Sequence, residues 1–393
     1  MIKGIKIMLK PNNKQKTKLF EFAGASRFAY NWTLAKQEDN RQNNGKFISD
    51  NELRKEFTQL KKQKDFKWLN NISNNVTKQA IKDCCIAYKK FFKGLAKHPR
   101  FKSRKHSTPK FYQDVIKIQF TATHVKFEGF ATSKKKNKQK LNWVRLAEKN
   151  KIPFNKDIKY INPRVSFDGV NWFISVGIEY NDNLEVPHNE GIGIDLGVKD
   201  LAVVNCLDKP IKNINKSVKV RKLKKRLKRL QRQVSRKYLM NKQNNKFIKT
   251  SNIIKLEYRI NKLHKRLTNI RNNYLHQTTT GIINREPMFV VMEDLNVQGM
   301  LKNKHLSKAI QEQCFYEFIR QMKYKCEWNN IKFIQVDRFY PSSKTCSCCG
   351  AIKKDLKLSD RVYKCDKCGL VIDRDKNASI NLSNYGKSIE LAS

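Results

Sequence analysis

A pair of Cys-x2-Cys motifs near the C-terminus limits most strongly how this chain can fold. Cys346 and Cys349 form the first pair, Cys365 and Cys368 form the second, and fifteen residues separate the pairs. Four cysteines at this spacing are typical of a zinc ribbon, and a glycine follows each pair, as the tight turns of that motif require. Because four thiolates fill the coordination sphere of zinc, we expect a structural metal and not a catalytic one.

The net charge of the chain points to a polyanionic partner. The 393 residues carry a formal charge of +49, with a pI near 10, which is far more than solubility requires. Nucleic acid is the commonest polyanion that such a charge attracts. Charge defines the class of partner and not the chemistry, so a basic protein that only coats RNA stays an alternative.

The remaining cysteines and the hydropathy of the chain predict a cytoplasmic protein. Cysteines outside the two pairs are scattered, most of them in apolar contexts, which fits a reducing compartment better than a disulfide framework. No stretch is apolar enough for a signal peptide or a membrane span. We therefore expect a cytoplasmic protein without a membrane partner, associated with the nucleoid when it is bound to DNA.

The first half of the sequence changes from strand to helix and back to strand. Residues 1–10 alternate polar and apolar side chains, residues 11–107 repeat apolar positions at helical spacing, and strand patterns return over residues 108–185. We therefore predict a multidomain α+β protein that begins with an antiparallel β-barrel, into which the helical region is inserted. The polar stretch NDNLEVPHNE, residues 181–190, marks the predicted boundary with the second half.

The second half contains two long and basic helix patterns. Residues 219–237 include eleven Lys or Arg and no acid, yet their leucines keep an apolar helical stripe. A second stripe runs from Leu256 to Tyr274, so we predict an antiparallel helical hairpin over residues 218–276. A solvated cationic face is the ordinary explanation of such a run. The charge density here favours a polyphosphate partner that neutralises it.

Three acidic residues stand where a strand ends or a helix begins. Asp195 and Glu293 each end a short apolar strand, and Asp375 lies in the first turn of a C-terminal helix that Asp373 would cap. Each of them could be an ordinary turn or cap residue. Inward carboxylates of this kind are also the ligands that paired Mg²⁺ ions need for hydrolysis of a phosphodiester bond. The sequence alone does not bring the three together.

Five motifs, in this order, resemble the TnpB family of transposon-encoded relatives of the type V CRISPR effectors. They are GIDLGVKDLAVV, VMEDLNV, VDRFYPSSKTCSCCG, CDKCG and DRDKNASINL. The resemblance spans nearly the whole chain. It implies that Asp195, Glu293 and Asp375 are catalytic acids that bind Mg²⁺, and that the four paired cysteines bind structural Zn²⁺. Ser379 stands where many members have alanine, and no acid is missing.

The resemblance also implies an architecture and partners. An RNase H-like (RuvC) α/β nuclease domain would comprise residues 186–343 and 369–393 and carry the basic hairpin, with a zinc ribbon at 344–368. The barrel would be a wedge domain and the helical insertion a recognition domain. A guide RNA from the transposon end would pair with one strand of double-stranded target DNA beside a short transposon-adjacent motif. We expect one protein copy to act alone.

Three functions are compatible with these features. The leading hypothesis is an RNA-guided, Mg²⁺-dependent DNA endonuclease. A catalytically silent RNA-guided DNA-binding repressor would keep the acids without cutting DNA. A general basic RNA-binding protein would bind RNA broadly and have no defined guide.

Overall fold

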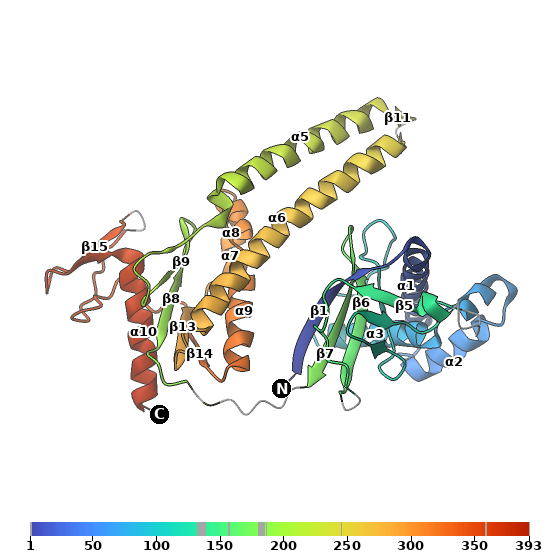
Figure 1. The fold of residues 1–393 in the computed structure, drawn as a ribbon, viewed down its shortest axis with the longest axis horizontal. Helices are drawn as coiled ribbons and strands as arrows, with labels where there is room; N and C mark the ends of the chain where they lie inside the picture. The colour runs from blue at the N-terminus through green and yellow to red at the C-terminus, as the bar shows by residue number, and fades with distance from the viewer. Residues whose placement is uncertain are drawn as a thin grey trace. The chain divides into compact units, whose positions relative to one another are not determined.

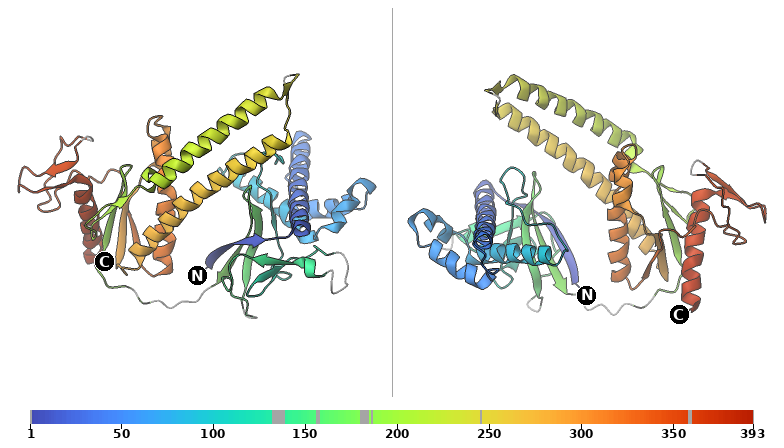
Figure 2. Two further views of the ribbon diagram at one scale, coloured as in Figure 1. Left: turned by 45° about the horizontal axis from the view of Figure 1, so that its top comes forward. Right: turned by 180° about the vertical axis from the view of Figure 1, so that it is seen from behind.

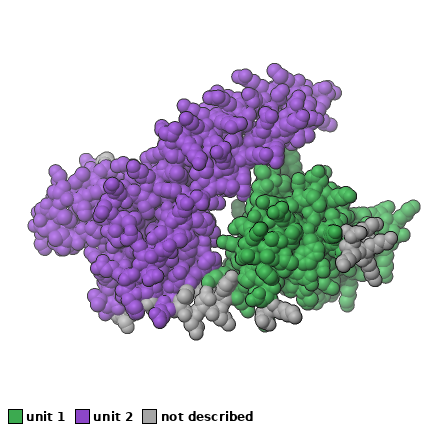
Figure 3. Space-filling view, in the orientation of Figure 1, with its two compact units in different colours: residues 1–182 green, residues 183–393 purple. Residues whose placement is uncertain are grey.

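The chain consists of two compact units, each with a hydrophobic core of its own (Figure 1; Figure 3). Unit 1 contains residues 1–182 and unit 2 contains residues 183–393. The computed structural model describes residues 2–131, 139–155, 158–179, 185, 187–244, 246–357 and 360–392. Among these described residues, no helix is long and apolar enough to cross a membrane. The finer division into wedge, recognition, nuclease and zinc-ribbon domains stays a prediction.

Unit 1 is an antiparallel sheet with helices inserted after its first strand. The strands are β1 (Ile2–Lys10), β2 (Lys110–Tyr112), β3 (Gln119–Phe120), β4 (His124–Lys126), β5 (Trp143–Leu146), β6 (Tyr160–Phe167) and β7 (Trp172–Glu179). The helical elements are α1 (Asn13–Gln42), α2 (Asp50–Leu60), η1 (Lys64–Asn71), α3 (Asn74–Phe92) and η2 (Lys140–Asn142). The seven strands lie in the order β2-β6-β7-β1-β5-β4-β3. Closure of this sheet into a barrel stays a prediction.

The alternation in the first ten residues explains the position of β1 in this sheet. Ile7 and Leu9 point into the core, and the strand pairs with β7 along nearly its whole length. Asn12 is the N-cap of α1, and its side chain accepts a hydrogen bond from the Gln15 amide in a capping box. Phe22 of α1 belongs to the same hydrophobic core as the strands, so the inserted helices and the sheet stabilise one another.

Unit 2 is built on a five-stranded mixed sheet in the order β10-β9-β8-β13-β14. Its strands are β8 (Ile192–Leu196), β9 (Asp200–Val204), β10 (Ile211–Lys212), β13 (Phe289–Glu293) and β14 (Lys332–Val336). Its larger helices are α5 (Val218–Met240), α6 (Ser251–Ile283), α9 (Phe315–Trp328) and α10 (Arg374–Ala392). Shorter elements are η3 (Ile214–Lys216), α7 (Val297–Lys302), α8 (Ser307–Gln313), and the hairpins β11 (Lys242–Gln243) with β12 (Lys246–Phe247) and β15 (Val362–Lys364) with β16 (Val371–Asp373).

Helices cover both faces of this sheet, which explains why its central strands are apolar throughout. Along β13, Val290 and Met292 pack with residues of α6 and α9. Phe289 and Val291 point to the opposite face and pack with α10 (Figure 1). Because side chains alternate along a strand, Glu293 continues the row of Phe289 and Val291 and lies on the face of α10.

The predicted basic hairpin is formed by α5 and α6. Val220 and Leu223 of α5 pack against Leu263 and Leu267 of α6, so the predicted apolar stripes do face one another. Figure 2 shows the hairpin from two further directions, extending away from the sheet of unit 2. Helix α6 runs seven residues beyond the predicted end, to Ile283, because its last turns are buried under the sheet.

Candidate metal centre

The three predicted acids come together where the inner strands β8 and β13 end and α10 begins. Strands β8 and β13 are parallel, and Gly193 pairs with Val291 while Ile194 pairs with Met292. This register sets Asp195 beside Glu293. Both side chains lie on the face that α10 covers, since Ile192 and Ile194 point to the other face.

Gly193 allows α10 to lie directly on the sheet. A Cβ atom at this position would come within 2.1 Å of the Ser379 carbonyl oxygen and 2.5 Å of the Ser383 amide nitrogen. Any larger residue would therefore push α10 away from β8. The first turn of α10 carries Asp375, so this close approach brings the third acid to the other two.

Burial and the neighbouring acids together determine the pKa of Asp195. Burial raises this pKa well above its ordinary value, and the carboxylates of Glu293 and Asp375 raise it further. The nearby Arg374 guanidinium acts in the opposite direction. A partly buried group of like charges is costly unless a cation joins it, and carboxylate oxygens are the ligands that Mg²⁺ prefers. Carboxylates are therefore the right type of donor for a divalent metal here.

Asp373 and Asp375 have different environments, as the sequence predicted. The exposed Asp373 carboxylate accepts hydrogen bonds of 3.0 Å from the amides of Asp375 and Lys376 and so caps α10. Asp375 is half-buried, with one carboxylate oxygen 3.8 Å from Arg374 Nε. Asp373 thus caps the helix, and although both aspartates raise the pKa of Asp195, Asp375 does so more strongly than Asp373.

Glu293 and Asp294 also point to different partners. Ser342 Oγ donates a hydrogen bond to Glu293 Oε1. Asp294 instead forms an ion pair of 2.9 Å with Arg338 at the surface. Ser342 was not among the residues predicted from the sequence, although it lies within the motif VDRFYPSSKTCSCCG.

The four paired cysteines come together as predicted. Their sulfur atoms all lie within 4.8 Å of one another, and the Cys346–Cys368 and Cys349–Cys365 Sγ distances are both 3.6 Å. A tetrahedron with Zn–S bonds of about 2.3 Å has edges of about 3.8 Å, so the thiolates fit zinc.

The turns around the four thiols suit metal binding as well. Gly350 and Gly369 both have φ +73°, the left-handed conformation that such turns need. Backbone N–H groups of Cys368 and Lys367 lower the pKa of Cys365 to about 6, whereas the pKa values of Cys349 and Cys368 are raised, so the four thiols do not ionise together without a metal. Cys348 is not part of the cluster.

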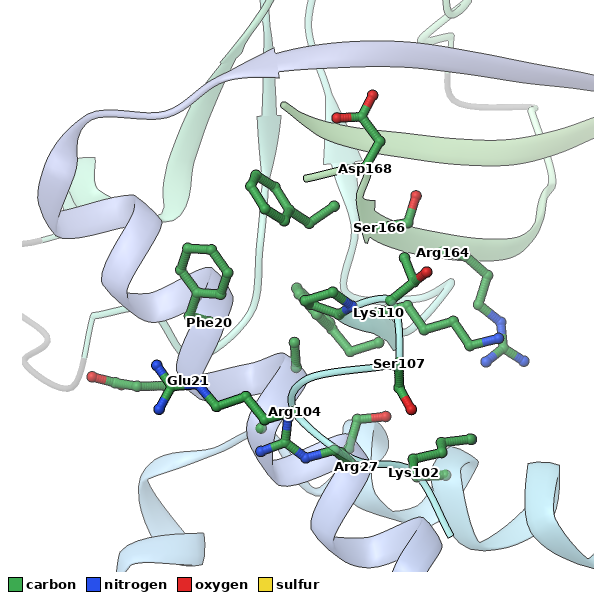
Figure 4. Close-up of a pocket in the computed structure, with 18 of the residues that line it drawn as sticks. Phe20, Glu21, Arg27, Lys102, Arg104, Ser107, Lys110, Arg164, Ser166 and Asp168 are labelled. Carbon is green, nitrogen blue, oxygen red and sulfur yellow. The ribbon is translucent and has the colours of Figure 1, made fainter. Parts of the chain in front are cut away.

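Unit 1 contains a basic pocket of about 1140 Å³ (Figure 4). Its Lys and Arg side chains come from β1, from α1, from the loop before β2, and from β2 and β6: Lys6, Arg27, Lys102, Arg104, Lys105, Lys110 and Arg164. Arg164 binds Asp83 through two hydrogen bonds of 2.6 and 2.9 Å. Lys102 lies 2.9 Å from the centre of the Tyr30 ring, and burial together with Lys110 lowers its pKa to about 8. Tyr30 itself is buried in the core.

Models of three protein families match this chain. The OrfB_IS605 model, described as "Probable transposase", matches residues 175–304, and the OrfB_IS605 helix-turn-helix domain matches residues 1–46. The Cas12f1-like TNB domain matches residues 315–382, which include the four cysteines and α10 up to Leu382.

Two relatives named as putative RNA-guided DNA endonucleases match nearly the whole chain. InsQ of Escherichia coli K12 is 29% identical over 99% of this chain and 93% of its own length. The protein of Streptomyces pristinaespiralis is 28% identical over 96% of this chain and 87% of its own length.

A solved structure shows the same fold. The Cas12f1 chain in a complex with sgRNA and target DNA matches with a TM-score of 0.59 at 12% identity, covering 98% of this chain and 99% of that one. The fold is therefore that of the Cas12f1 class. The family models and the two full-length relatives support a TnpB family protein, as the motifs predicted.

Proposed function

We propose that this chain is an RNA-guided DNA endonuclease. The observation that carries the proposal is the convergence of Asp195, Glu293 and Asp375, where two inner strands end and α10 begins, in a protein of charge +49. The names of the two full-length relatives support the same activity. A structural role alone would not explain three neighbouring acids when burial and then the charges of Glu293 and Asp375 raise the pKa of Asp195.

Each acid has a role in this proposal. Asp195, Glu293 and Asp375 would hold Mg²⁺, as in an RNase H-like site, and would thereby set where the scissile phosphodiester meets the attacking water. Bound Mg²⁺ supplies activation of water and charge stabilisation at the leaving oxygen. Zn²⁺ on Cys346, Cys349, Cys365 and Cys368 stabilises the ribbon and takes no part in cleavage.

The basic surfaces are proposed to bind the nucleic acids. The hairpin α5–α6 offers eleven cations on residues 219–237 to the phosphates of a guide RNA or of its duplex with DNA. The basic pocket of unit 1 would hold the DNA backbone beside the transposon-adjacent motif, with Arg27 and Arg164 among its cations. Base pairing with the guide would then select the sequence. We propose that the protein acts in the cytoplasm as one copy per guide.

The test starts with the protein expressed from its native locus. Sequencing of the RNA that copurifies should give one structured species ending in a variable segment. The purified complex should then cut DNA that matches this segment and carries the adjacent motif. We expect Asp195→Ala and Asp375→Asn to lower the cleavage rate more than about 100-fold, because even changes around metal ligands cost 10–100-fold.

Asp373→Asn is the matched control for Asp375→Asn. Asparagine caps a helix as well as aspartate does, so this variant should cut at close to the wild-type rate. Normal cleavage by Asp195→Ala would refute the proposed site. A single guide RNA with sequence-specific binding but no cleavage would favour the repressor, and a mixture of cellular RNAs would favour the general RNA-binding protein.

A further inference from the structure

The segment between β14 and the first zinc cysteines contacts the acidic site directly. Ser342 is only 3% exposed, and its hydroxyl donates a hydrogen bond to Glu293 Oε1. A carboxylate has two oxygens, so a donor fixed on Oε1 defines the direction in which Oε2 points. Partners of this kind orient metal ligands, and their loss weakens metal binding.

Two buried asparagines of α10 hold this segment in place. Asn381 Nδ2 donates hydrogen bonds of 2.7 Å to the carbonyl oxygens of both Ser342 and Thr345. Asn377 Nδ2 donates a third, also of 2.7 Å, to Thr345, and its Oδ1 accepts one of 3.0 Å from the Ser347 amide. Asn377 is fully buried and Asn381 is 3% exposed, so water does not compete for these hydrogen bonds.

These contacts join the zinc cluster to the acidic site. Thr345 and Ser347 flank the zinc cysteine Cys346, and Ser342 lies three residues before Thr345. The helix that carries Asp375 thus holds, through Asn377 and Asn381, the backbone on both sides of the first zinc ligand. The same backbone presents the hydroxyl that binds Glu293.

We propose that Ser342 is a positioning residue, which orients the Glu293 carboxylate for its metal, and that Asn381 sets the position of Ser342. The inference rests on the proposed function, because it takes Glu293 to be a metal ligand. The zinc ribbon then has a second role, since the folded ribbon fixes one end of the segment that supports Glu293.

The test compares three variants of the full-length complex with its guide RNA. Ser342→Ala removes the hydroxyl, Ser342→Thr keeps it, and Ser343→Ala makes the same change at the neighbouring position. The Mg²⁺ concentration that gives half-maximal cleavage should rise about 10-fold in Ser342→Ala. It should stay within about twofold of wild type in the other two variants.

A binding measurement separates positioning from a general structural defect. Titration of Mn²⁺, followed by its electron paramagnetic resonance signal, should show the same loss of affinity in Ser342→Ala without any cleavage. Zinc content and melting temperature in Mg²⁺-free buffer should match those of wild type. If Ser342→Ala does not fold, Ser342→Cys, whose thiol is a weak donor, should show an intermediate loss of Mn²⁺ affinity.

Asn381→Ala tests the second part of the proposal. It should also raise the Mg²⁺ concentration that gives half-maximal cleavage. The double variant with Ser342→Ala should need no more Mg²⁺ than the poorer single variant, because both changes act through the hydrogen bond from Ser342 to Glu293. Additive effects would overturn the part played by Asn381.

Failure of this inference is distinguishable from failure of the proposed function. If Asp195→Ala does not cut DNA but Ser342→Ala needs no more Mg²⁺ than wild type, only the role of Ser342 is overturned. An active Asp195→Ala would overturn the metal site itself.

Discussion

At the scale of single residues, the acidic site destabilises the fold when no metal is bound. The pKa of Asp195 lies above its value in the unfolded chain, so the folded state binds more protons from about pH 4 up to the raised pKa. The free energy of unfolding therefore falls as pH rises through this range. At pH 7, we expect zinc-loaded Asp195→Asn to melt at a higher temperature than wild type in Mg²⁺-free buffer. Each kcal/mol that the substitution adds to the free energy of unfolding should raise the melting temperature by about 2–4 °C.

Two comparisons sharpen this measurement of melting temperature. Near pH 4 the difference should shrink, because Asp195 is then protonated in the folded wild type. Saturating Mg²⁺ should reverse the order, since a ligand at 100 times its Kd adds about 2.7 kcal/mol to the form that binds it. Asp294→Asn alters the neighbouring acid that pairs with Arg338 and should change little. A wild type that melts higher at pH 7 without Mg²⁺ would contradict the prediction.

At the scale of elements, one face of the hairpin α5–α6 packs its two helices together and the other face carries the cations that we propose bind RNA. Leucines on the inner face hold the two helices together, and Lys225, Arg229 and Arg232 lie exposed on α5. We expect the triple change of these cations to Gln to weaken guide RNA binding. A plot of the log of the RNA-binding constant against the log of the salt concentration has a negative slope. That slope should become less steep by about 0.7 for each phosphate that the variant no longer neutralises. Circular dichroism should show an unchanged helix content.

The control for this variant removes the same charge elsewhere in unit 2. Lys302, Lys308 and Lys323 are exposed and lie outside the hairpin. Changing these three to Gln should leave the salt slope closer to that of wild type. Equal slopes for the two triple variants would mean that only total charge matters and that the hairpin is not a specific binding surface.

At the scale of the whole molecule, loss of zinc should unfold one region and not the chain. The ribbon has a small core around Tyr363, which cannot stay folded without its metal. Unit 1 has a separate core. In Cys349→Ser we therefore expect hydrogen exchange to speed up over residues 343–373 and to stay unchanged in unit 1, as measured by mass spectrometry.

Cys348→Ser is the matched control, because this thiol lies beside the cluster and is not part of it. It should retain zinc and normal exchange. Slow exchange over residues 343–373 in a Cys349→Ser protein that is shown to lack zinc would contradict a structural role of the metal.

Features that depend on neighbours along the chain could be predicted from the sequence. The cysteine spacing predicted the thiol cluster, the apolar stripes predicted the hairpin, and the position of Asp373 before an amphipathic helix predicted its cap. The motifs identified the family. Such features follow from local periodicity and chemistry, which remain visible in a linear sequence.

Which side chains share a surface, in contrast, depends on the tertiary structure. Asp195 and Glu293 are 98 residues apart in the sequence, and the register of β8 with β13 sets them side by side, while a glycine under α10 admits Asp375. A shift of one residue would turn either acid to the other face. Ser342 lies within a family motif, but its contact with Glu293 could not be predicted from the sequence, because it depends on hydrogen bonds between segments that only packing brings together.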